Sequence, residues 1–214
     1  MKDEVTIGIF GVQGDVEENI AATQEALRHM KVRGAVELVR YSEEIEKVDS
    51  LILPGGESTA ISTLATIQGV GTLQTIKRLV SNGMPVMGTC AGMIMLSRRA
   101  YDRVIGETKQ QLMGNLDIVV ERNAFGRQND SFEADLEIPA FGKNTFRGIF
   151  IRSPIVREIG KGVDKIAEFN NKIVAVKQQN IIGTAFHPEL SGDDRFHRYF
   201  ISMVLDFKKN QQKS

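Results

Sequence analysis

At 214 residues, the chain is long enough to enclose one substantial hydrophobic core and falls within the usual size of a single domain. Its 27 Lys and Arg residues balance 27 Asp and Glu residues, which argues against nucleic-acid binding, and its single cysteine excludes an intrachain disulfide or a cysteine-rich metal site. The charged start at residues 1–4 precedes an apolar run too short for a secretory signal, and no stretch approaches the roughly 18 apolar residues of a membrane span, so we expect a cytoplasmic protein without membrane contact.

The first half of the chain alternates strand-like and helix-like segments. Short apolar runs that predict buried strands occupy residues 5–10, 35–39, 50–53 and 85–90. Helical patterns occupy residues 16–30 with Asp15 as a cap, a short turn at 42–45, a stretch reaching about 82 with a break near Gly69 and Gly71, and residues 91 to about 100. Such alternation favours a parallel sheet with helices on both faces.

The second half of the chain has a different pattern: strand-like segments follow one another with little helix between them. These segments lie at residues 116–120, 132–138, 146–151, 165–169, 173–177 and 181–186. A last helix is expected from about 193 to 207, and residues 208–214 are expected to fray. We therefore expect one α/β domain over residues 1–207: a flavodoxin-like three-layer fold with a mainly parallel central sheet flanked by helices, and extra antiparallel strands in the second half.

Cys90 stands in the sequence Gly88-Thr89-Cys90-Ala91-Gly92, between a predicted strand and a predicted helix. A reactive side chain among small residues at such a turn is typical of a nucleophile elbow, which is too tight for bulky neighbours. The start of the helix favours a thiolate, and the Ala91 N–H would face a developing oxyanion. The alternative is an inert buried thiol, which is common for a free cysteine.

His187 and Glu189 supply the other groups that such a nucleophile needs. His187 follows the last predicted strand, and the carboxyl ends of parallel strands meet at one edge of a sheet, so we expect it near Cys90. Glu189 follows a rigid Pro188 and can reach back to the far ring nitrogen of the base. A structural histidine and a surface carboxylate are the alternatives. His29 and His197 are expected on the solvated surface.

The segment Pro54-Gly55-Gly56-Glu57-Ser58 follows the third predicted strand. It fits an ordinary strand-to-helix turn, but the Gly56 amide could also donate to an oxyanion. A phosphate-binding loop is disfavoured because the segment lacks lysine and Glu57 carries the wrong charge.

Together these motifs resemble the class I (triad) glutamine amidotransferases. Over nearly the whole chain, the sequence is similar to one family of that class, the PdxT family of glutaminase subunits of pyridoxal 5′-phosphate synthase. The motifs around Cys90 and His187 alone indicate only the class, whereas the middle segments indicate the family. The segments that carry the resemblance are residues 11–14, 53–59, 88–92, 119–128, 130–134, 150–154 and 186–189.

The resemblance implies hydrolysis of L-glutamine to L-glutamate and ammonia, with ammonia passing to a separate PdxS-type synthase subunit. It implies a catalytic triad of Cys90 as nucleophile, His187 as base and Glu189 as its partner, with Gly56 and Ala91 as oxyanion donors. It further implies that glutamine is held by Gly56, Glu57, Ser58, Arg122, Ile151 and Arg152. Arginine suits this task because a guanidinium grips a carboxylate in bidentate fashion, although surface ion pairs are the alternative for both arginines. No metal or organic cofactor is expected.

A glutaminase that ran without its synthase would waste glutamine. We therefore expect the partner to activate this chain by repositioning a loop, and the flexible Gln13-Gly14 segment after the first strand is the candidate. Two other functions stay open at this point. One is the glutaminase of imidazole glycerol phosphate synthase, which shares the triad. The other is a non-catalytic flavodoxin-like protein with one exposed cysteine.

Overall fold

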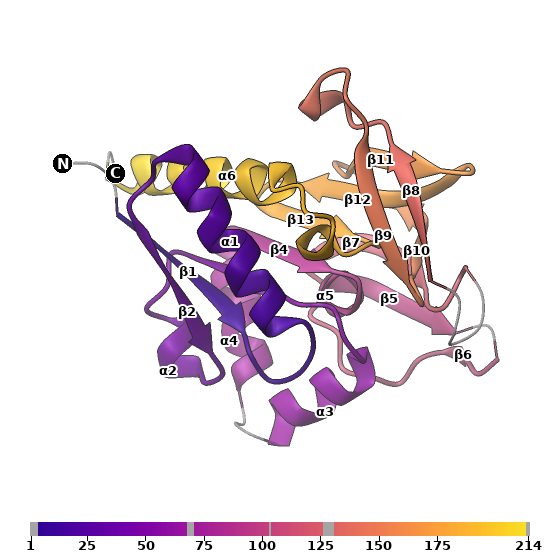
Figure 1. Cartoon of the computed structure of the whole chain (residues 1–214). Coiled ribbons are helices and arrows are strands. Elements are labelled where there is room, and N and C mark those ends of the chain that lie inside the picture. The colour runs from indigo at the N-terminus through magenta and orange to yellow at the C-terminus, as the bar shows by residue number, and fades with distance from the viewer. Residues whose placement is uncertain (1–3, 68–70, 103, 126–130, 213–214) are drawn as a thin grey trace.

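The computed structural model describes residues 4–67, 71–102, 104–125 and 131–212. Figure 1 shows its layered arrangement of strands and helices. The first half contains β1 (Val5–Phe10), α1 (Val16–Met30), β2 (Gly34–Val39), α2 (Ser42–Ile45), β3 (Ser50–Leu53), α3 (Ser58–Ile67), α4 (Thr72–Ser81), β4 (Val86–Thr89) and α5 (Ala91–Leu96). The second half contains β5 (Ser97–Asp102), β6 (Gly106–Glu107), β7 (Leu116–Glu121), β8 (Ser131–Leu136), β9 (Phe146–Ile151), β10 (Ile155–Ile159), β11 (Asp164–Phe169), β12 (Lys172–Gln178), β13 (Ile181–Thr184) and α6 (Arg195–Gln211). Two 3-10 turns, η1 and η2, cover Pro139–Phe141 and Pro188–Leu190.

The main sheet has two halves of different character. Its order is β2-β1-β3-β4-β13-β12-β10-β7-β5-β6, with β11 beside β12. Within the run β2-β1-β3-β4-β13, each strand is parallel to the next. From β13 onward β12, β10 and β7 pair antiparallel, while β5 is parallel to β7. This confirms the expected α/β class with extra antiparallel strands in the second half.

Helices cover both faces of the parallel half. On one face α1 packs against α6, and on the other α3 contacts α4 and α5, while α2 contacts α4 (Figure 1). Right-handed crossovers explain why the helices lie on both faces. The chain moves outward from β1 to β2 and then returns past β1 to β3, so successive crossovers run in opposite directions and place their helices on opposite faces. Within the described residues, no helix is long and apolar enough to cross a membrane.

A separate two-stranded antiparallel sheet, β8 with β9, stands beside the main sheet. Aromatic rings fasten it there: Phe150 of β9 packs on Phe186 with ring centroids 5.5 Å apart, and Phe186 packs on Phe196 of α6 at 5.3 Å. Such pairs contribute about 0.5–1.5 kcal/mol beyond their buried area. Because Phe150 and Phe186 directly precede Ile151 and His187, this packing fixes the positions of both.

Three sequence expectations need correction. The helix after Cys90 ends at Leu96, not near residue 100, because Ser97 turns extended and begins β5, which pairs with β7. Strand β10 was not expected at all. The final helix continues through Gln211, so residues 208–211 are helical instead of frayed, and Lys208 is anchored by an ion pair of 2.8 Å to Asp49.

The expected helix break is confirmed at Gly71, where α4 begins after a residue with φ of 118°, while Gly69 lies outside the described residues. The family-specific residues 126–128 and 130 also lie outside them.

Candidate active site

Four loops meet at the carboxyl edge of the parallel strands. Strands β1, β3, β4 and β13 are consecutive neighbours in the sheet. The loops that follow them carry Asp15, Gly55, Cys90 and His187, respectively. Thr89 and Thr184 pair at the ends of β4 and β13, and the Cys90 N–H donates to the Thr184 carbonyl at 2.7 Å. The expected meeting of Cys90 and His187 at one edge of the sheet is confirmed.

Cys90 sits on a strained turn between β4 and α5. Its φ of 47° and ψ of −102° lie in a region that side chains rarely adopt, and such strain is concentrated at functional sites. The neighbouring glycines are needed for space. A Cβ on Gly92 would lie 2.0 Å from the Leu53 carbonyl oxygen, and one on Gly88 would lie 2.6 Å from the Gly92 backbone. The backbone therefore has the geometry of a nucleophile elbow.

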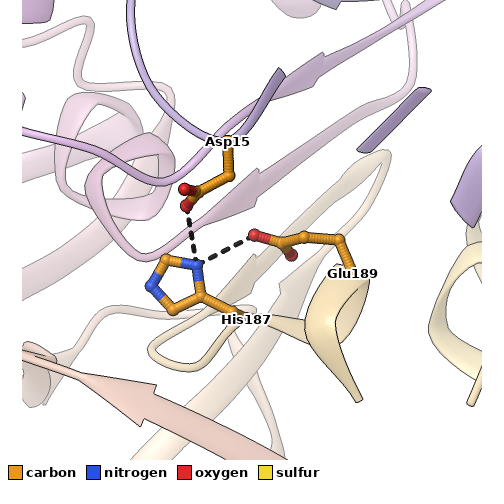
Figure 2. Close-up of side chains that lie close together, drawn as sticks. All are labelled: Asp15, His187 and Glu189. Atoms are coloured by element: carbon orange, nitrogen blue, oxygen red, sulfur yellow. Dashed lines mark hydrogen bonds and ion pairs between the residues drawn. The ribbon is translucent and has the colours of Figure 1, made fainter. Parts of the chain in front are cut away.

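The imidazole of His187 is held by carboxylates through one ring nitrogen. Figure 2 shows that both carboxylates face Nδ1 of the ring. Nδ1 lies 2.9 Å from Glu189 Oε1 and 3.0 Å from Asp15 Oδ2. The His187 residue is only 3% exposed, and the Glu189 side chain is fully buried. With Nδ1 engaged in this way, Nε2 is the nitrogen available to the thiol, and His187 also hydrogen-bonds Cys90. This arrangement fixes the ring tautomer that a base for Cys90 requires.

The surroundings of His187 favour its protonated form. Burial by itself lowers the pKa, but hydrogen bonds to Asp15, Cys90 and Glu189 outweigh that effect and raise the pKa of His187 to about 12. The hydrogen bond to His187 is also the main reason that the pKa of Asp15 is lowered. Desolvation by burial acts in the opposite direction but is the smaller effect. The site is therefore built to keep an imidazolium beside the sulfur.

Gly55 makes room for this contact between the base and its partners. A Cβ at this position would stand 2.3 Å from His187 Cε1 and 2.8 Å from Asp15 Oδ2. Both distances are shorter than any real side chain tolerates, so residue 55 must lack a side chain if the ring is to stay where it is.

A cavity of about 180 Å³ opens in front of Cys90 and His187. Its lining includes all the residues expected to hold glutamine: Gly56, Glu57, Ser58, Arg122, Ile151 and Arg152. A larger hollow of about 580 Å³ lies next to it, and Arg122 borders both. The smaller cavity holds the reactive groups, so we place the chemistry there.

Glu57 and Arg122 form the polar wall of this cavity. Arg122 Nη2 lies 2.9 Å from Glu57 Oε1, and Nη1 donates to Thr59 and to Gln110. The Glu57 carboxylate also accepts the N–H groups of Thr59 and Ala60 at the start of α3. Its pKa is lowered, since desolvation, the largest influence, is outweighed by these backbone hydrogen bonds and by Arg122. Glu57 therefore caps a helix as well as lining the cavity.

The β8–β9 sheet supplies the opposite wall. The Ile151 carbonyl lies 3.9 Å from Cys90 Sγ, and the His187 N–H donates to the Ile149 carbonyl at 2.8 Å. Arg152 follows with φ of 46°, an unusual backbone conformation of the kind found at ligand sites. Residues from both halves of the chain thus enclose one cavity.

Asp15, His187 and Glu189 form the one cluster, among the residues that the structure describes, with metal-ligand donor atoms within 4.8 Å of one another. Hydrogen bonds account for its geometry, because both carboxylates lie at ordinary donor–acceptor distance from the same ring nitrogen.

Sequence reasoning missed two residues of this site. Asp15 was expected only to cap α1, yet its carboxylate makes no capping hydrogen bond and contacts His187 instead. Gln110 lies in a segment that carried no motif, yet it accepts from Ser58 at 3.1 Å and from Arg122. The one available signal was the position of Asp15 after the first parallel strand, at the same edge as Cys90.

His197 corrects another expectation, because it is not on the surface. It is fully buried on the inner side of α6, and neither ring nitrogen has a hydrogen-bond partner among the described residues. Burial lowers its pKa to about 4, only partly opposed by Asp194. The prediction for His29 is confirmed, since its side chain is 56% exposed.

A model of the SNO glutamine amidotransferase family matches residues 9–206 of the chain. The chain belongs to this family. Two curated relatives are each described as a pyridoxal 5′-phosphate synthase subunit PdxT. The protein from Nitrosopumilus maritimus is 44% identical, covering 95% of this chain and 98% of its own. The protein from Streptomyces coelicolor is 46% identical, covering 95% and 96%.

Solved structures agree with the family assignment. One described as a glutamine amidotransferase matches with a TM-score of 0.78 and 39% identity, covering 92% of this chain and 98% of its own. A glutamine amidotransferase from Thermotoga maritima matches with a TM-score of 0.60 at 12% identity, covering 99% of this chain and 86% of its own, which shows a shared fold alone. The chain is therefore an enzyme of the glutamine amidotransferase family, and the resemblance seen in its sequence is confirmed.

Proposed function

We propose that this chain hydrolyses L-glutamine to L-glutamate and ammonia at Cys90 and delivers the ammonia to a PdxS-type synthase subunit for pyridoxal 5′-phosphate formation. The observation that carries the proposal is the convergence of a strained Cys90 and a carboxylate-bound His187 on one cavity. Relatives named as PdxT subunits of pyridoxal 5′-phosphate synthase, similar over nearly the full length of the chain, support the choice of pathway.

The first half of the reaction forms a thioester. His187 Nε2 takes the proton of the Cys90 thiol, and the resulting thiolate attacks the side-chain amide carbon of glutamine. The carbonyl oxygen becomes an oxyanion, which we assign to the backbone N–H groups of Gly56 and Ala91. Losing one such donor typically costs about 3–4 kcal/mol of transition-state stabilisation. When the intermediate collapses, the imidazolium gives its proton to the departing nitrogen, and ammonia leaves a γ-glutamyl thioester behind.

The second half regenerates the enzyme. His187 accepts a proton from water, and the hydroxide attacks the thioester carbon. The carbon–sulfur bond then breaks and leaves a Cys90 thiolate beside the imidazolium, while the new carboxyl group gives its proton to solvent and glutamate leaves. Glu189 holds the ring through its contact with Nδ1. The steps need no metal and no organic cofactor.

Glutamine recognition is assigned to the cavity walls. Arg122 and Arg152 carry the positive charge that suits the α-carboxylate of an amino acid. Glu57, Ser58 and the backbone around Ile151 supply acceptors and donors for the remaining polar groups of the substrate. We place this single catalytic domain in the cytoplasm, where a lone thiol stays reduced.

Glutaminase assays with and without the synthase subunit test the proposal. We expect little ammonia release from the isolated chain, a large increase when the synthase is added, and no release from Cys90→Ala in either case. A glutamine-analogue electrophile followed by mass spectrometry should label Cys90, the only cysteine.

Three outcomes would contradict this function or its regulation. Ammonia release by Cys90→Ala at the wild-type rate would remove the assigned nucleophile. Stimulation only by an imidazole glycerol phosphate synthase partner would change the pathway. Equal rates with and without the synthase would refute control by the partner.

A further inference from the structure

Two carboxylates from remote parts of the chain converge on one nitrogen of His187. Glu189 lies two residues after the histidine, in the turn η2, and its side chain is fully buried. Asp15 comes from the loop after β1, and its side chain is 35% exposed. A protonated ring carries a single hydrogen on Nδ1, so the two carboxylates must share it. A triad needs only one of them, which leaves Asp15 without a place in the mechanism above.

Asp15 gives up its usual role to make this contact. It occupies the N-cap position of α1, where an aspartate normally accepts an N–H of the first turn. Its carboxylate makes no such hydrogen bond and points instead at the imidazole (Figure 2). When a residue does not make the capping hydrogen bond that its position favours, its side chain is held elsewhere by another constraint, here the contact with His187.

The loop that carries Asp15 is fastened to the loop that carries Gly55 and Gly56. The Asp15 N–H donates to the Gly55 carbonyl at 3.2 Å, and Gln13 Oε1 accepts the Glu57 N–H at 2.9 Å. Gly55 leaves the space that the Asp15 carboxylate and the imidazole fill. The position of the carboxylate at Nδ1 therefore depends on how residues 13–15 sit against residues 55–57.

We propose that Asp15 is a second positioning residue for the catalytic base, sharing the Nδ1 proton of His187 with Glu189 and stabilising the imidazolium that protonates the departing ammonia. This inference rests on the proposed function of the site. Asp15 acts through His187 and does not touch the reacting atoms. Because it belongs to residues 11–15, any movement of that loop changes the charge beside the base.

The charged groups around His187 are few. Asp15 comes from the loop after β1, Glu189 from η2 and Cys90 from the elbow, and all three contact the ring. Glu57, Arg122 and Arg152 line the same cavity. Among the described residues that contact the ring, Asp15 is the one acidic group outside the triad, so replacing it isolates the second carboxylate.

The test compares Asp15→Asn and Asp15→Ser with Glu17→Gln. Asparagine and serine are both good N-cap residues, so α1 should stay intact, which far-UV circular dichroism checks. Glu17 lies in the exposed first turn of the same helix, so its variant loses the same charge without the contact to His187. The pH dependence of kcat/KM for glutamine is measured in complex with the synthase subunit. The His187 ring nitrogens are titrated by NMR in the isolated, isotope-labelled chain, which contains only three histidines.

We expect both Asp15 variants to lose the imidazolium proton at a pH lower by about one to two units, in the basic limb of kcat/KM and in the NMR titration alike. Glu17→Gln should keep the wild-type profile. Wild-type titration of His187 in both Asp15 variants would overturn the inference, and so would an equal shift in Glu17→Gln. If the wild-type complex releases no ammonia, the proposed function fails, while the NMR titration still decides whether Asp15 holds the proton.

Discussion

Two histidines of this chain are almost equally buried, yet they have opposite environments. His187, at the carboxyl edge of the parallel strands, is 3% exposed and holds two carboxylates at Nδ1. These carboxylates and Cys90 raise its pKa to about 12 against the effect of burial. His197, on the inner side of α6, is 0% exposed, has no partner for either ring nitrogen among the described residues, and has its pKa lowered to about 4 by burial. Burial alone therefore does not decide whether a histidine carries a charge.

The two histidines also have opposite effects on how the stability of the fold changes with pH. The folded-state pKa of His187 lies above its unfolded value of 6.5, so its contribution is fully present below pH 6.5 and is lost as the pH rises. The folded-state pKa of His197 lies below that value, so the unfolded chain binds the extra proton and stability falls as the pH drops from 6.5 toward 4. The active-site histidine thus stabilises the fold in acid, and the core histidine destabilises it.

Replacing each histidine should separate chemistry from packing. We expect His187→Asn to lower kcat for glutamine by about 10⁴-fold or more, because it removes the base and its carboxylate pairing together. His197→Leu should keep kcat within a few-fold of wild type, since the residue lies outside the cavity. Steady-state ammonia release with the synthase present measures both. Comparable losses in the two variants would break the distinction between the two sites.

Acid titration of stability should sharpen the comparison. Between pH 6.5 and 4, the wild-type free energy of unfolding should fall by about 3 kcal/mol more than that of His197→Leu, from the pKa difference at a fully buried site. Because the same carboxylates titrate in wild type and variant, their contributions to the free energy of unfolding cancel when the two curves are subtracted. Urea unfolding at several pH values provides the measurement. Parallel pH curves for wild type and variant would contradict the assignment of a neutral, unpartnered His197.

A side chain at residue 55 should displace the ring of His187 and leave His197 unaffected. In Gly55→Ala, the new Cβ would lie 2.3 Å from His187 Cε1 and 2.8 Å from Asp15 Oδ2, so ring and carboxylate must move apart. Misplacement of this kind can lower kcat by about 10²-fold. Ammonia release measures kcat, and NMR compares His187 with His197, whose signals should not change. A fully active Gly55→Ala would show that the ring tolerates displacement.

The third histidine offers an exposed reference for the other two. His29 lies on α1, pairs with Glu25 at 2.8 Å and with Asp194 at 2.7 Å, and its side chain is 56% exposed. Solvent screens such pairs, so His29→Gln should change the free energy of unfolding by no more than about 1 kcal/mol. Thermal and urea unfolding at pH 6 test this, and a loss as large as that of a buried ion pair would show that exposure is a poor guide here.

Much of the fold could be predicted because periodicity is local. The strands and helices of the parallel half follow from apolar runs and glycine or proline boundaries, and the elbow at Cys90 follows from its small neighbours. Strand β5 could not be predicted in this way. Its residues continue a helical pattern, and pairing with β7 and β6 makes them extended. Tertiary pairing overrides local propensity there.

The sequence by itself determined which chemical groups this protein has and which strand ends carry them: a thiol among glycines, an imidazole two residues before a carboxylate, and a family resemblance over nearly the whole chain. The tertiary structure decided which carboxylates reach His187, why the Asp15 carboxylate does not cap α1, and that His197 is buried without a partner among the described residues. The physical reason is that pKa values and hydrogen bonds depend on groups a few ångströms apart in space. Those neighbours are set by the order of strands in the sheet, which local residue patterns do not encode.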